Sequence, residues 1–387
     1  MKNASRAANP ATAKAATLPD PEQHPAFAKA LRTAAFARSQ AFLAGIKAYQ
    51  HHPARRAMPE MPILWQDGTT CLRDFNPAAT PEAPAILVVP SLINRFDILD
   101  LDRDHSFLHT LAARGFRPLL IDWAEPGTAE KDFALADYAG RLEAALDFVT
   151  QRLEAGGWRL EKNHSPNLQP PASKPHLLGY CMGGLLALAL AAKRPDKIRT
   201  LSLLATPWDF HAPDPGIGAQ FIALAGQMEP HLAQYGQLPV DVIQSLFAGF
   251  QPLQTGKKFT DFASLDPAGI EARHFVLLED WLNDGVPLTA PVARECLRDW
   301  YGANLTGKLA WRVGETLIDP RKLAMPAYVV APGKDRIVPP ESARPLAKIL
   351  PHAALHEPMT GHIGMIASAK APQQVWAALF NWLEKHG

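Results

Sequence analysis

The chain has 387 residues, with 39 basic and 38 acidic side chains and a formal net charge of +1. This balance gives no global field that would attract nucleic acid or an anionic membrane, so we expect no nucleic-acid partner and a locally recognised substrate. The three cysteines, Cys71, Cys181 and Cys296, are odd in number and far apart, which excludes a disulfide framework and a cysteine-rich metal site and indicates a reducing compartment.

Length and hydropathy limit the architecture. At about 150 residues per domain, the length predicts two domains or one large domain with an insertion. The longest apolar run, 185–192, is shorter than the roughly 20 residues that span a bilayer. Residues 1–16 lack the apolar stretch of a secretory signal. We therefore expect a cytoplasmic protein without a transmembrane span.

The N-terminal part divides into two segments. Residues 1–24 are rich in Ala, Pro and Asn without periodicity, which predicts disorder. Over 26–49, apolar residues recur at near-helical intervals with basic residues between them, as is typical of an amphipathic helix. We assign it to an N-terminal helical segment, 25–62, that lies against the main domain. A membrane-surface or partner role is the less favoured alternative.

The next segments alternate between strand and helix patterns. Residues 63–75 form two strand-like halves around Asp67-Gly68, a dipeptide favoured in tight hairpin turns. The alternation that follows predicts an α/β fold, a mostly parallel sheet with helices on both faces. The predicted strands are 85–90, 117–123, 176–180, 200–205, 327–331 and 354–356, and the predicted helices are 107–114, 133–153, 182–192, 341–350 and 372–384.

Residues 208–319 interrupt the alternation. They combine helix-forming stretches with many aromatic residues. The simplest interpretation is an inserted, mainly helical cap over the carboxyl edge of the sheet, where open α/β folds bind ligands. The core is then 63–207 together with 320–387. Many of the cap aromatics should form the cap's own core and a few should line an acyl-binding passage, but their spacing does not identify which.

The sequence Gly179-Tyr-Cys-Met-Gly183 joins a short apolar strand directly to an Ala- and Leu-rich helix. It repeats the G-x-S-x-G nucleophile elbow with sulfur in place of oxygen. The glycines leave room for a strained apex, and the helix N-terminus favours a thiolate at Cys181 and a developing oxyanion. The alternative is that Cys181 is a buried structural cysteine without a catalytic role. The pentapeptide alone does not decide between a catalytic and a structural cysteine.

A thiol nucleophile needs a base and a third group that orients the base, and α/β hydrolases carry these in the order nucleophile, acid, histidine. Asp335 follows a predicted core strand, and His362 stands in a Gly-His-Ile-Gly loop after the last one. We therefore predict a catalytic triad of Cys181, Asp335 and His362. Asp209, which follows an earlier strand, is the rival acid, although we expect it to cap the first turn of the insertion.

The oxyanion hole should have two backbone donors. The N–H after the nucleophile belongs to Met182. The second should come from the loop after an early strand, where we predict Ile93, with its neighbour Leu92 as the alternative. We predict neither a metal nor a bound cofactor.

Five stretches resemble the polyhydroxyalkanoate synthases, α/β-hydrolase-fold enzymes that polymerise hydroxyacyl-CoA on a cysteine. The stretches are 89–101 (VPSLINRFDILDL), 179–184 (GYCMGG), 201–210 (LSLLATPWDF), 335–339 (DRIVP) and 361–363 (GHI), and the similarity runs from about residue 63 to the C-terminus. The resemblance implies that Cys181 is acylated, that His362 is its base and that Asp335 is the acid.

Two stretches depart from the family pattern. The family usually has a second proline and a tryptophan where Ser91 and Leu92 stand. Its acid loop usually reads Asp-His-Ile-Val-Pro-Trp, whereas this chain has Arg336 and Pro340.

The resemblance implies an acyltransferase that polymerises 3-hydroxyacyl-CoA into polyhydroxyalkanoate through a cysteine thioester. The CoA thioester would be a substrate and the polyester chain the acceptor. The alternative is hydrolysis by the same triad, as in a thioesterase, an esterase or a polyester depolymerase. A non-catalytic granule-binding scaffold ranks last. Whether the protein acts as a homodimer, with a partner subunit or at polyester granules is left open.

Overall fold

The structure is a computed structural model that describes residues 24–155, 174–212, 214, 216–249 and 254–387. Disorder was predicted for residues 1–24, of which 1–23 lie outside the described residues. The chain divides into two compact units, one from Met1–His52 with Leu253–Pro267 and the other from Pro53–Pro252 with Ala268–Gly387.

The smaller unit pairs two helices, α1 (Pro25–His51) and α7 (Gln254–Phe262). The helix predicted at 26–49 is confirmed. A Cβ at Gly45 would lie 1.9 Å from the carbonyl oxygen of Phe259, so only glycine allows this approach. The predicted cap boundary differs here, because residues 254–262 group with α1. The absence of strand-helix alternation located the insertion in the sequence. It could not show on which helix each segment of the insertion packs.

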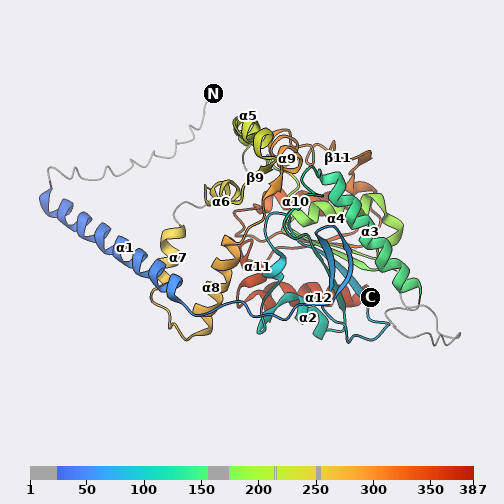
Figure 1. The fold of residues 1–387 in the computed structure, drawn as a ribbon, viewed down its shortest axis with the longest axis horizontal. Coiled ribbons are helices and arrows are strands. Elements are labelled where there is room, and N and C mark those ends of the chain that lie inside the picture. Colours follow the sequence, from blue (N-terminus) through green and yellow to red (C-terminus); the bar gives the residue numbers. More distant parts are fainter. Residues whose placement is uncertain (1–23, 156–173, 213, 215, 250–253) are drawn as a thin grey trace, which may run out of the picture. The chain divides into compact units, whose positions relative to one another are not determined.

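An eight-stranded sheet, in the order β1-β2-β6-β3-β7-β8-β13-β14, lies at the centre of the larger unit (Figure 1). Gly68, with φ +57°, turns β1 into β2 at the predicted hairpin. β2 runs antiparallel to β6, and every later pair is parallel. The predicted mostly parallel sheet is confirmed. Its strands are β1 (Ile63–Asp67), β2 (Thr70–Asp74), β3 (Ala85–Val89), β6 (Arg117–Asp122), β7 (His176–Tyr180), β8 (Leu201–Leu204), β13 (Ala327–Val330) and β14 (Ala353–His356).

Helices cover both faces of the sheet. Alternate residues of β3 belong to different hydrophobic clusters, Leu87 and Val89 to one and Ile86 and Val88 to the other, as the period of two in a strand requires. The first cluster includes α3 and α4, and the second includes α2 and α12 (Figure 1). These helices are α2 (Phe107–Ala113), α3 (Leu135–Glu154), α4 (Met182–Lys193) and α12 (Ala377–Lys385).

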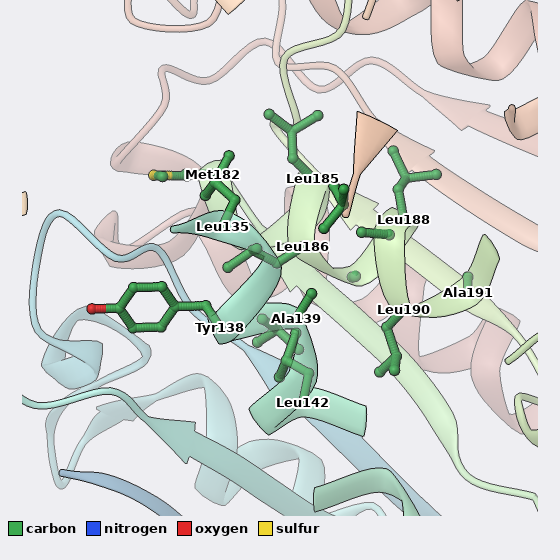
Figure 2. Packing of buried hydrophobic residues seen from close by; sticks show 14 of the residues in the cluster. Leu135, Tyr138, Ala139, Leu142, Met182, Leu185, Leu186, Leu188, Leu190 and Ala191 are labelled. Carbon is green, nitrogen blue, oxygen red and sulfur yellow. The ribbon is translucent and has the colours of Figure 1, made fainter. Parts of the chain in front are cut away.

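The helix after the elbow, α4, is buried all round. Every residue from Met182 to Ala191 is buried, and Leu186 and Leu190 lie with Leu142 of α3 in one cluster (Figure 2). Burying a leucine side chain contributes about 1.5–3 kcal/mol. This packing fixes the helix whose first turn carries the elbow.

The region predicted as a cap is mainly helical. It also contains four two-residue strands in two antiparallel pairs, which were not predicted because they are too short to show a period of two. Its elements besides α7 are α5 (Ile217–Tyr235), β9 (Gln237–Leu238), α6 (Val240–Gly249), α8 (Ile270–Asn283), β10 (Leu288–Thr289), α9 (Ala290–Arg294), a π-helical segment (Glu295–Gly302), β11 (Arg312–Val313) and β12 (Thr316–Leu317).

The remaining elements surround the sheet edge and the C-terminus. They are β4 (Asp100–Asp102), β5 (His105–Ser106), α10 (Pro340–Ile349), α11 (Gly364–Ala367), a second π-helical segment (Pro372–Trp376), and the short 3₁₀ helices Phe96–Leu99, Pro195–Lys197 and Pro320–Lys322. Every helix within the described ranges is too short or too polar to span a membrane.

Candidate active site

Cys181 stands at the apex of a sharp turn between β7 and α4. Its backbone has φ +54° and ψ −126°, a strained conformation for a residue with a side chain. Two backbone hydrogen bonds hold the turn: the N–H of Cys181 donates to Leu204 at 2.8 Å, and the N–H of Gly184 donates to the carbonyl of Cys181 at 3.0 Å. The thiol is partly exposed at the N-terminus of α4.

The glycines of the elbow are required by close contacts. A Cβ at Gly179 would lie 2.5 Å from the Cα of Gly184, and one at Gly183 would lie 2.2 Å from the carbonyl oxygen of Val89. Gly184 is equally constrained, since its Cβ would lie 1.8 Å from Oγ1 of Thr206. The turn therefore depends on the absence of side chains on both flanks of Cys181.

The structure brings the two predicted partners of Cys181 together. Nδ1 of His362 lies 2.7 Å from Oδ2 of Asp335. The other carboxylate oxygen, Oδ1, accepts the backbone N–H groups of Ile337 and Val338 at 2.9 and 2.8 Å. Both side chains of the pair are buried. With Nδ1 engaged by Asp335, Nε2 is the ring nitrogen left for the thiol.

Charge favours the protonated form of His362. Burial alone lowers its pKa, but the charges of Cys181 and Asp335 and the hydrogen bonds to both side chains raise it to about 10. The protonated imidazole of His362 can therefore serve as the acid that protonates a leaving group after a cysteine sulfur has attacked a carbonyl carbon.

The rival acid, Asp209, is engaged elsewhere. Its Oδ1 accepts the side-chain N–H of Asn304 at 2.8 Å and the backbone N–H of His211 at 3.0 Å. Asn304 also accepts the N–H of Phe210 at 3.0 Å. The expected role in capping the first turn of the insertion is wrong, because α5 begins only at Ile217. Asp209 instead ties the start of the insertion to Asn304.

The two residues predicted to supply the oxyanion donors, Met182 and Ile93, line the same cavity as Cys181. The N–H of Ile93 donates to the hydroxyl of Ser91 at 3.2 Å, so an oxyanion would have to share or displace that bond. The alternative donor, Leu92, lines a separate, smaller pocket.

A largely apolar cavity opens onto Cys181. About 750 Å³ of space outside the protein atoms lies in it, part of which is open solvent. The lining residues are Ile93, Cys181, Met182, Pro207, Phe210, Phe221, Leu238, Ile243, Leu246, Leu288, Ala293, Cys296, Leu297, Trp300, Tyr301, Ile337 and Val338. Most of them come from the insertion, which therefore forms the wall facing the nucleophile.

The sequence had left open which aromatics of the insertion line the passage. The structure selects Phe210, Phe221, Trp300 and Tyr301. Trp311, by contrast, is 1% exposed and belongs to the hydrophobic core. Cys296 also lines the cavity, and burial raises its pKa well above that of a free thiol. Contacts between distant segments decide this selection, and no motif marks it.

The described residues contain no group of three or more His, Cys, Asp or Glu side chains placed to hold a metal ion.

The sequence matches one family profile and several individual proteins. The profile of the alpha/beta hydrolase fold family matches residues 169–369. The poly(3-hydroxyalkanoate) polymerase subunit PhaC of Synechocystis sp. is 29% identical over 83% of this chain and 83% of its own length. The protein of the same name from Allochromatium vinosum is 28% identical over 84% of this chain and 88% of its own length.

A solved structure shares the fold. A Mycobacterium tuberculosis protein assigned as a non-heme bromoperoxidase, BpoC, superposes with a TM-score of 0.51. The match covers 86% of this chain and 100% of that one, at 15% identity. At this identity the likeness concerns the fold alone.

Proposed function

Because this chain belongs to the alpha/beta hydrolase fold family and its sequence relatives are poly(3-hydroxyalkanoate) polymerases, we propose that it is an acyltransferase that polymerises 3-hydroxyacyl-CoA. The observation that carries the proposal is the elbow cysteine, Cys181, backed by the buried pair of His362 and Asp335. In this proposal the acyl chain is carried as a thioester on Cys181.

The first half-reaction loads the thiol. The Cys181 thiolate attacks the carbonyl carbon of the CoA thioester, and the oxyanion is held by the backbone N–H of Met182. Collapse of the tetrahedral intermediate breaks the bond to the CoA sulfur. The departing sulfur takes the proton from Nε2 of His362, which leaves a neutral imidazole.

The second half-reaction moves the acyl group to a hydroxyl. Neutral His362 accepts the proton of an acceptor hydroxyl on another hydroxyacyl unit, whose oxygen attacks the thioester carbonyl on Cys181. The new ester bond forms, the bond to the cysteine sulfur breaks, and the thiolate is restored beside the imidazolium. Asp335 keeps Nδ1 protonated and the ring oriented throughout.

Hydrolysis is the second candidate, because water could take the place of the acceptor hydroxyl. The cavity favours transfer: its wall is built mainly from aliphatic and aromatic side chains, which suit an acyl chain and offer water few hydrogen-bond partners. We propose the polyester chain as acceptor on this ground. The proposal also includes that the protein acts at the surface of polyester granules, and that it does so as a homodimer or together with another subunit.

One assay separates the two candidates. CoA release and polymer formation are followed together with 3-hydroxybutyryl-CoA, and the mass of Cys181 is checked for an acyl adduct. Polymer formed in step with CoA release supports the polymerase. Free hydroxy acid without polymer supports the hydrolase instead, and no acyl adduct in either case contradicts both.

A further inference from the structure

One wall of the cavity is a π-helical segment, Glu295–Gly302. Four of its residues, Cys296, Leu297, Trp300 and Tyr301, line the cavity. A π-helix has more residues per turn than an α-helix, so positions four and five apart come onto one face, and such segments are frequent at functional sites. The turn that follows Cys296 therefore brings both Trp300 and Tyr301 to the cavity wall.

The side chains of this cavity offer very few polar atoms. Among the described residues that line it, only Trp300 and Tyr301 have side chains that contain nitrogen or oxygen. Nε1 of Trp300 is enclosed by protein atoms, so a ligand in the cavity does not reach it. Oη of Tyr301 forms no hydrogen bond with any described residue and, unlike Nε1 of Trp300, it keeps accessible surface.

The ring of Tyr301 packs against two other residues of the same wall. It stacks on Phe221, with ring centroids 4.2 Å apart and planes at 17°, and it meets Phe210 edge-on with centroids 4.8 Å apart. The backbone is held as well, because Nε2 of His211 lies 2.7 Å from the carbonyl oxygen of Tyr301. These contacts fix the position of the ring before any ligand binds.

The hydroxyl of Tyr301 lies on the cavity side of its ring. Burial raises the pKa of Tyr301 above that of a free tyrosine, and the charges of Cys181 and Cys296, which line the same cavity, raise this pKa further. Charge interactions weaken with distance, so their effect on Tyr301 indicates a phenol oxygen directed toward the two thiols. With a raised pKa the phenol stays protonated at neutral pH, and it can donate a hydrogen bond.

We propose that the hydroxyl of Tyr301 binds the oxygen that a hydroxyacyl group carries beyond its thioester carbonyl, and thereby selects hydroxyacyl substrates over plain acyl ones. This oxygen is a hydroxyl in the monomer and an ester oxygen in the growing chain, and a phenol can donate to either. A polar atom that leaves water for an apolar cavity loses its hydrogen bonds, which is costly unless a protein group replaces them.

The assignment follows from which donors the acyl group can meet. In the proposed mechanism the thioester carbonyl oxygen takes the backbone N–H of Met182. Among the described lining side chains, the hydroxyl of Tyr301 is the nitrogen or oxygen atom left for the second oxygen of the acyl group. The inference rests on the proposed function and adds its substrate specificity.

The test compares two acyl donors on the whole protein. Acylation of Cys181 is measured as single-turnover CoA release with 3-hydroxybutyryl-CoA and with butyryl-CoA, which lacks the hydroxyl. Tyr301→Phe removes the phenol oxygen and keeps the ring that stacks on Phe221. We expect the rate with 3-hydroxybutyryl-CoA to fall about tenfold, a value typical of one neutral hydrogen bond. The rate with butyryl-CoA should change by less than about twofold, which would also show that the variant is folded.

Tyr328→Phe is the matched control. It also removes one tyrosine hydroxyl, but from a buried residue of β13 that lies outside the cavity lining, and it should keep the wild-type ratio of the two rates. An equal fall with both donors in Tyr301→Phe would mean that Tyr301 only shapes the wall, and it would overturn the proposal. An unchanged ratio in Tyr301→Phe, or an equal change of the ratio in Tyr328→Phe, would overturn it too.

Failure of the proposed function shows separately. If wild-type Cys181 is acylated by neither donor, the acyltransferase proposal fails and this inference falls with it. If the wild type is acylated but the ratio does not change in Tyr301→Phe, the acyltransferase stands and only the role of Tyr301 is rejected.

Discussion

Nδ1 of His362 lies 2.7 Å from Oδ2 of Asp335, although the two residues are 27 positions apart in the chain. Asp335 follows β13 and His362 follows β14, and these neighbouring strands run parallel. Their carboxyl ends therefore deliver both loops to one edge of the sheet. The pairing leaves Nε2 of His362 for Cys181, whose strand β7 ends at the same edge.

Asp335→Asn should remove the group that orients the His362 ring without disrupting the fold of the loop that carries residue 335. Its Oδ1 can still accept the N–H groups of Ile337 and Val338, so the loop should persist. The amide cannot hold His362 in the required tautomer or stabilise its positive charge, and we expect the acylation rate to fall by roughly 10⁴-fold. Single-turnover CoA release measures this rate.

Asp209→Asn is the control for that substitution. Asp209 accepts hydrogen bonds from Asn304 and from the N–H of His211, and among the described residues it forms no hydrogen bond with His362. The acylation rate should change by less than about threefold, with a loss of stability of about 1 kcal/mol from the altered hydrogen bonds. A collapse of the rate in Asp209→Asn, with Asp335→Asn unaffected, would transfer the acid role to Asp209.

Cys181→Ala should abolish the acyl adduct and leave the fold intact, because the turn is built by the flanking glycines. Cys181→Ser should be far slower than the wild type, since His362 would have to deprotonate a hydroxyl instead of a thiol. Mass spectrometry after incubation with 3-hydroxybutyryl-CoA, with circular dichroism as the folding check, measures both. Wild-type turnover by Cys181→Ala would end the covalent mechanism.

His362 should stay protonated well above neutral pH. Its folded-state pKa of about 10 lies above the value near 6.5 of a free histidine, so the imidazolium should persist through pH 7–9 and be lost only as the pH rises through about 10. Cys181→Ala removes the charge interaction and the hydrogen bond by which Cys181 raises the pKa of His362, whereas burial, which lowers that pKa, remains. The pKa of His362 should therefore fall in the variant. NMR titration of the His362 ring in both proteins tests this; identical titration curves would contradict the coupling.

Gly183→Ala should destabilise the elbow. The new Cβ would lie 2.2 Å from the carbonyl oxygen of Val89 and 2.4 Å from that of Pro90, so β3 or α4 must shift, at a cost of about 1–3 kcal/mol. Gly226→Ala is the matched control, because a Cβ there meets nothing within 4 Å in α5 and should stabilise by about 0.5–1 kcal/mol. Urea unfolding gives both values, and equal effects would refute the steric argument.

Thiol labelling should single out Cys181. Cys71 and Cys296 are buried, whereas Cys181 is partly exposed, and burial raises the pKa of both buried thiols. In the native protein a small alkylating reagent should modify Cys181 first, and Cys181→Ala should remove that label. A bulky reagent should react more slowly, because it must enter the cavity. Equally fast labelling by both reagents would show that the insertion does not restrict access.

The sequence by itself determined the alternation of elements and the motifs at the strand ends. Apolar strands such as Ala85–Val89 and the helix of Met182–Lys193 are buried through most of their length, so local hydrophobic patterns predicted them. The glycines around Cys181 and the chain order of Cys181, Asp335 and His362 are equally local signals. Parallel strands then bring their carboxyl ends together, which makes a site at this edge predictable.

Only the tertiary structure decided what faces Cys181. Phe210 and Trp300 line the cavity whereas Trp311 is core, because packing between segments far apart in the chain sets their positions, and neither spacing nor composition encodes that choice. The grouping of α7 with α1, and the tie between Asp209 and Asn304, arise in the same way. Hydrophobic periodicity shows that a side chain is buried, but its partner is selected by the shape and hydrogen bonding of the folded chain.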